Sequence, residues 1–115
     1  MNNAYAFCLV SYHRKIDREY HFVMHIMQYH FLRPSQEQQD KIQSCIRFVK
    51  AGELNTAGEV IKSVIQELWR ERDVPVTMGC TELPLAYEAS GLPLERQVSS
   101  LKALSDACIR VLYEV

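Results

Sequence analysis

The chain has 115 residues, of which 48% are hydrophobic and 23% are charged, and its formal net charge is −1. This length is close to the commonest size of a single domain, so we expect one domain over residues 1–115. The composition is that of an ordinary folded globular protein. Because a nearly neutral chain attracts neither phosphate backbones nor anionic lipid, we expect no nucleic acid and no membrane as partners.

The beginning of the chain has a short apolar run, residues 4–10, without the charged region and cleavage site of a signal peptide. No run approaches the roughly 20 apolar residues of a membrane-spanning helix. We therefore expect a cytoplasmic protein. In a reducing compartment, cysteines without a CxxC pair are expected to be free thiols, and here they are Cys8, Cys45, Cys80 and Cys108.

The first third of the chain predicts two strands separated by a helix. Residues 4–10 are continuously apolar, which is typical of a strand covered on both faces. Apolar residues in the range 16–28 have the spacing of one helical face. The short aromatic-rich run 29–32 predicts a second strand, which Arg33-Pro34 would end.

The middle of the chain predicts two helices in tandem. Ser35 and Gln38 have the spacing of a capping box, and Gly52 would supply the C-terminal cap of the first helix. Asn55 or Thr56 would cap the second helix. The apolar faces that we expect to be buried are Ile42, Cys45, Ile46 and Val49 in the first helix, and Val60, Ile61, Val64, Ile65 and Leu68 in the second, with Trp69 at its edge.

The last third predicts two more strands and a helix. Residues 74–78 read as a strand, in which Pro75 suits an edge strand or the first residues of a strand. A loop marked by proline and glycine follows, then a short strand over 94–98, and a helix capped by Ser99. The alternation predicts an α/β fold: a single three-layer domain with a small, mostly parallel sheet of about four strands flanked by helices.

Cys80 follows the expected strand over 74–78 directly, and ligands of open parallel sheets bind beyond the carboxyl ends of the strands. Gly79 would allow close backbone approach, and the amides of Thr81 and Glu82 could turn toward an anion. These features predict a lowered pKa for the Cys80 thiol. The alternative interpretation of a lone cysteine is a small buried hydrophobic residue.

The run MGCTELPLAYEASGLPL around Cys80 resembles the GCTE segment of the aspartate/glutamate racemase family. LRPSQEQQ followed by VKAG, and VSSLKAL near the end, also resemble family segments and occur in the family's order. The resemblance covers the C-terminal half of the family. It implies a racemase that uses no pyridoxal phosphate or other cofactor, in which one cysteine removes the α-proton of an amino acid and another returns a proton to the opposite face.

Residue roles follow from this resemblance. It implies that Cys80 is the second catalytic thiol, that Thr81 offers its amide and hydroxyl to the substrate carboxylate, and that Glu82 orients the thiol. Ser11 and His13 stand in the substrate-binding turn after the first strand, where the family has small threonine and glycine residues. They are therefore candidate substrate contacts.

The chain also departs from the family. The family's first half, which carries the other thiol, has no counterpart here, and the last turn reads Ser99-Ser100-Leu101 where the family has an acid and a hydroxyl. We interpret Cys8, Cys45 and Cys108 as packing residues because they fall within a strand or on apolar helix faces. We therefore expect a domain that is incomplete alone and forms a homodimer or higher homo-oligomer, in which two copies of Cys80 could meet.

Two functions stay open at this point. One is a thiol-based aspartate or glutamate racemase that takes an amino acid as its small-molecule partner. The other is a degenerate, non-catalytic binding or interaction module of racemase origin. A metal is not expected: His21 and His25 have a zinc-ligand spacing, but no third ligand is evident.

Overall fold

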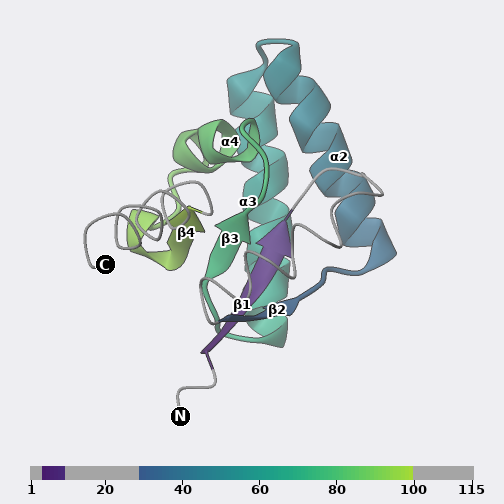
Figure 1. Ribbon diagram of the computed structural model, residues 1–115. Coiled ribbons are helices and arrows are strands. Elements are labelled where there is room, and N and C mark those ends of the chain that lie inside the picture. Colours follow the sequence, from purple (N-terminus) through teal and green to yellow (C-terminus); the bar gives the residue numbers. More distant parts are fainter. Residues whose placement is uncertain (1–3, 10–28, 100–115) are drawn as a thin grey trace, which may run out of the picture.

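A computed structural model describes residues 4–9 and 29–99 (Figure 1). Its elements in order are β1 (Ala4–Leu9), β2 (Tyr29–Leu32), α2 (Gln36–Lys50), α3 (Leu54–Glu71), β3 (Val76–Met78), α4 (Leu83–Ser90), the 3-10 helix η1 (Leu94–Arg96) and β4 (Gln97–Ser99). The predicted α/β class is confirmed. The helices expected over 16–28 and after Ser99 lie outside the described residues.

The strands form one sheet in the order β2-β1-β3-β4, and each neighbouring pair is parallel. Phe7 is in register with Leu32 on one side and with Val76 on the other. The amide of Gly79 donates to the carbonyl of Leu9 at 2.8 Å, which continues the β1–β3 pairing past the end of β3. Because the strands are parallel, their carboxyl ends lie at one edge of the sheet.

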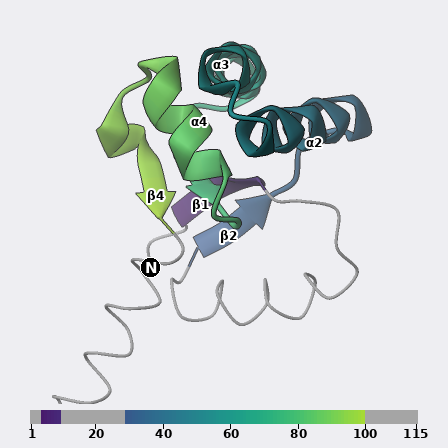
Figure 2. The same ribbon diagram turned by 90° about the horizontal axis from the view of Figure 1, so that it is seen from above.

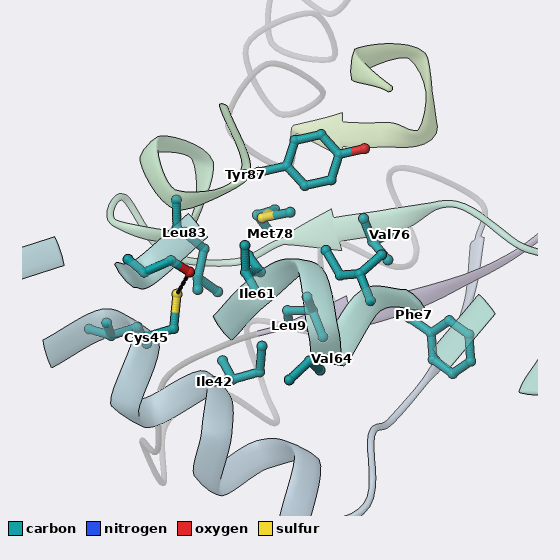
Figure 3. Packing of buried hydrophobic residues seen from close by; sticks show 14 of the residues in the cluster. Phe7, Leu9, Ile42, Cys45, Ile61, Val64, Val76, Met78, Leu83 and Tyr87 are labelled. Atoms are coloured by element: carbon teal, nitrogen blue, oxygen red, sulfur yellow. Dashed lines mark hydrogen bonds between the residues drawn. The ribbon is translucent and has the colours of Figure 1, made fainter. Parts of the chain in front are cut away.

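The described helices α2, α3 and α4 lie on one face of this sheet (Figure 2). Side chains alternate between the two faces of a strand. The strand side chains on the face toward the helices pack with helix residues in one buried cluster. From the strands, this cluster contains Phe7, Leu9, Val76 and Met78 (Figure 3). Ala6, Cys8 and Thr77 are also buried but stand at the alternate positions, on the opposite face.

The start and end of α2 confirm the predicted signals. The Ser35 hydroxyl accepts from the Gln38 amide at 3.2 Å, and the Gln38 side-chain oxygen accepts from the Ser35 amide at 2.8 Å. This is the reciprocal capping box. The side-chain amide of the buried Gln38 also donates to Glu67 of α3 at 2.9 Å, which ties the two helices together. Gly52, with φ of +78°, follows the last turn as expected.

Helix α3 begins earlier than predicted. Its N-cap is Glu53, so the prediction that Asn55 or Thr56 caps the helix is wrong. The tight turn after α2 explains the difference, since the Glu53 amide bonds to the Phe48 carbonyl at 2.8 Å and its own carbonyl accepts from the Ala57 amide. The predicted apolar stripe is buried at Ile61, Val64, Ile65 and Leu68.

The segment that the sequence predicted as a loop contains helix α4. Pro84 stands in the first turn, where its missing amide hydrogen costs nothing, and Gly91, with φ of +75°, ends the helix. Leu83, Ala86 and Tyr87 form its buried face. The proline and the glycine therefore mark the two ends of a short helix rather than an irregular loop.

Two strand predictions also need correction. β3 begins at Val76 rather than at residue 74, and it lies inside the sheet, with Pro75 just before its first residue. The Pro75 carbonyl still accepts from the Phe7 amide at 2.9 Å, so its lack of a donor does not disturb the pairing. The range 94–98 starts as η1, and β4 begins only at Gln97.

Candidate functional site

Cys80 lies at the carboxyl edge of the sheet, between the end of β3 and the beginning of α4. It is a free, half-buried thiol that packs against the hydrophobic core. Both flanking elements fix its position: the bond from Gly79 to Leu9 holds the end of β3, and Leu83 anchors α4 in the core. The thiol is thus where ligands of parallel sheets bind, as the sequence predicted.

The protonation of Cys80 differs from the prediction. Burial raises the pKa of the Cys80 thiol above its ordinary 9.0. Hydrogen bonds from the backbone amides of Leu83 and Glu82 lower this pKa, but their effect is smaller than that of burial. The carboxylate of Glu82 raises the pKa further through its charge and as a hydrogen-bond partner of the thiol. The predicted lowering is therefore wrong, because desolvation outweighs the amides. Cys80 carries its proton at neutral pH.

Glu82 is the centre of a small polar network beside this thiol. One carboxylate oxygen, Oε2, accepts from the Thr81 hydroxyl at 3.2 Å, and the other, Oε1, lies 3.9 Å from Nζ of Lys50. The Lys50 side chain is 66% exposed and that of Glu82 26%. The structure thus brings the predicted residues Cys80, Thr81 and Glu82 together, and adds Lys50 from the end of α2.

A second thiol, Cys45 of α2, lies in the hydrophobic core (Figure 3), and Cys80 packs against the same core. It is fully buried and its Sγ donates to the carbonyl of Ala57 at 3.4 Å. Burial, and then the charge of Cys80, raise the pKa of Cys45 to about 12. The two sulfur atoms are therefore close enough to interact electrostatically, and Cys80 ionises first. The burial of Cys45 agrees with the predicted packing role.

Sequence reasoning missed Lys50 and the proximity of Cys45 to Cys80. Both belong to α2, and α3 and β3 separate that helix from the Cys80 loop along the chain. No motif spacing could reveal contacts that depend on how α2 packs beside α4. Lys50 did stand in the VKAG segment that the family resemblance singled out.

Other candidate residues lie outside the described residues. Ser11 and His13, and the histidine pair His21 and His25, fall in the range 10–28. Over residues 4–9 and 29–99, no group of three or more His, Cys, Asp or Glu side chains could hold a metal ion. In the same ranges, no helix is both long and apolar enough to cross a membrane.

Comparisons with protein-family models, with curated proteins and with solved structures found no match to this chain. A protonated thiol, two amides that favour its thiolate, an acceptor carboxylate and an exposed ammonium group are together suited to moving a proton on an anionic substrate.

Proposed function

We propose that this chain is a thiol-dependent acid/base domain of the aspartate/glutamate racemase type, which supplies the proton-donating half of the reaction. One observation carries the proposal. Cys80 is a free, half-buried thiol at the carboxyl end of an inner parallel strand, and the backbone amides of Leu83 and Glu82 are placed to stabilise its thiolate.

The chemistry requires a thiol and a thiolate on opposite faces of the substrate. In the donating step, the S–H bond of Cys80 breaks, a C–H bond forms at the α-carbon, and the negative charge moves from the carbanion to sulfur. The amides of Glu82 and Leu83 stabilise that sulfur. Run in reverse, the thiolate removes the α-proton. The hydroxyl and amide of Thr81 would bind the substrate α-carboxylate, as the family resemblance implies.

The other thiol has to come from outside the described site. Cys45 is unsuitable, because it is fully buried and its Sγ donates to the carbonyl of Ala57, so it cannot reach a substrate. We propose a homodimer, or a higher homo-oligomer, in which Cys80 of a second copy takes this role. No cofactor and no metal enter this scheme.

The proposal includes a single three-layer domain in the cytoplasm, with helices on both faces of a sheet of about four strands. Support for a second helical layer comes from Ala6, Cys8 and Thr77, which are buried and alternate along the strands with the residues that face α2, α3 and α4. The predicted amphipathic segment 16–28 and the predicted final helix are the candidates for that layer.

The test is exchange of the α-proton of L- and D-aspartate and L- and D-glutamate in heavy water, followed by proton NMR. We expect exchange with the unmodified chain, little with Cys80→Ser, and normal exchange with Cys45→Ala, the matched control for loss of a thiol. Because the pKa of Cys80 is raised, the rate should climb with pH beyond 9.0. Equal exchange by the chain and Cys80→Ser would refute the catalytic role.

A second candidate is a binding module that no longer turns over substrate. The raised pKa of Cys80 favours it, because a racemase also needs a thiolate near neutral pH. This function predicts binding of an acidic amino acid at micromolar concentration without any α-proton exchange. Calorimetric titration beside the exchange experiment separates the two functions.

A further inference from the structure

We propose that Leu54 and Leu85 form the centre of a two-fold interface through which two copies of this chain associate, with their Cys80 loops (residues 79–82) on either side of the axis. The inference rests on the proposed function only in giving the second copy a role at the Cys80 site. It adds the surface that brings the copies together, which the expectation of a homodimer left undefined.

The two leucines belong to one apolar patch. Among the described residues, the exposed large apolar side chains are those of Leu54 (42%), Leu85 (50%) and Leu94 (66%). Helices α3 and α4 touch where a Cβ added to Gly58 would lie 2.9 Å from the carbonyl carbon of Ala89. Leu54 and Leu85 each stand four residues, about 6 Å, before one of these contact residues and on the same helix face. The patch therefore lies across the contact of α3 with α4.

An ion pair borders this patch. Lys50 stands four residues before Leu54, Glu82 stands three residues before Leu85, and Nζ of Lys50 lies 3.9 Å from Oε1 of Glu82. Their side chains are 66% and 26% exposed, so both charges reach the surface. A two-fold axis places the same surface on both copies, so the pair can meet its own copy with each ammonium group facing the other copy's carboxylate. The surface is thus complementary to itself in charge.

An interface centred on this patch includes the Cys80 loop. A stable association buries about 800 Å² of each partner, which is much more than two leucine side chains provide. The loop joins α4 at Leu83, two residues before Leu85, so an area of that size extends over it. A second copy seated on the patch therefore brings its own Cys80 loop to the other side of the axis.

Analytical ultracentrifugation of the unmodified chain and of Leu85→Asp tests the interface. We expect a dimer for the unmodified chain and association about 30-fold weaker, or worse, for the variant, because two carboxylates would face each other across the axis in place of an apolar contact. Leu94→Asp is the matched control, since Leu94 is exposed but stands before the amino end of β4, toward the opposite edge of the sheet. It should leave the dimer intact.

A mixture of two variants tests the position of the axis. Leu85→Asp and Leu85→Lys should each be monomeric alone, because like charges would meet. Mixed together, they should form a heterodimer, because position 85 of one copy faces position 85 of the other. Such a heterodimer would also show that both variants are folded.

Several results would overturn the inference. A monomeric unmodified chain would do so, since the leucines would then be free for a different partner. The others are a dimer that survives Leu85→Asp, an equal loss in Leu94→Asp, or variants of opposite charge that stay monomeric when mixed. A Leu85-dependent dimer without any α-proton exchange would keep this interface and remove the racemase proposal. Cys80-dependent exchange by a monomer would do the opposite.

Discussion

Replacing Gly58 with alanine tests the contact that positions α4, and with it the Cys80 loop. Gly58 is a buried residue in the first half of α3, where it faces the end of α4. A Cβ added there would lie 2.9 Å from the carbonyl carbon of Ala89 and 3.0 Å from the amide nitrogen of Ser90. Those atoms are backbone, so they can yield only if the whole of α4 moves.

Two opposing effects decide the sign of the change in stability. Alanine in a helix interior is favoured over glycine by about 1 kcal/mol. Against this, overpacking a tight contact costs about 1–3 kcal/mol, and moving the 2.9 Å contact out to 3.4 Å would shift α4 by 0.5 Å. The steric cost should win, because the helix would also pull Leu83, Ala86 and Tyr87 out of the core. Because the contact is with backbone, we take the cost at about 2–3 kcal/mol, and after the gain of about 1 kcal/mol we expect a net loss of about 1–2 kcal/mol.

The assay is urea denaturation followed by far-ultraviolet circular dichroism. Ser63→Ala, at an exposed position of the same helix, is the control for helix propensity alone and should be slightly more stable than the unmodified chain. A Gly58→Ala variant as stable as the unmodified chain, or more stable, would refute the close approach of α3 and α4.

The remaining predictions concern the two thiols. The pKa of Cys45 is about 12 in the folded chain and 9.0 ordinarily, so the unfolded chain loses this proton first as the pH rises. Cys45 should therefore leave the free energy of unfolding unchanged below pH 9. Between pH 9 and pH 12 that free energy should fall by about 1.4 kcal/mol per pH unit. Urea denaturation at several alkaline pH values checks this, and an equally steep fall in Cys45→Ala would contradict it. Glu82→Gln removes a charge and a hydrogen-bond partner that both raise the pKa of Cys80, so iodoacetamide should alkylate Cys80 several-fold faster at pH 8, as measured by mass spectrometry. An unchanged or slower reaction would show that Glu82 does not control the thiol.

Local signals in the sequence were sufficient for much of the fold. The ends of α2 were predictable because Ser35, Gln38 and Gly52 act within a few residues of one another. β2 was predicted with its observed bounds, since Arg33-Pro34 follows it at once. In contrast, Pro84 and Gly91 are compatible with both a loop and a short helix, and only the packing of Tyr87 in the core decides between them.

The candidate site was predictable only in part, for a similar reason. Cys80, Thr81 and Glu82 are contiguous and follow a strand, so their sequence alone brings them together. Whether the pKa of Cys80 is raised or lowered depends on how deeply the thiol is buried, and no sequence motif specifies that depth. The contact of Lys50 with Glu82 likewise depends on packing between elements that are distant along the chain.

We propose above all that an acidic amino acid binds at the carboxyl end of β3, around Cys80. A titration of the nitrogen-15-labelled chain with L-aspartate, followed by two-dimensional amide NMR, tests it most directly. We expect saturable shifts of the amides of Thr81, Glu82, Leu83 and Lys50, with those of Trp69 and Asp73 unchanged. No shifts, or shifts centred on Trp69, would contradict it.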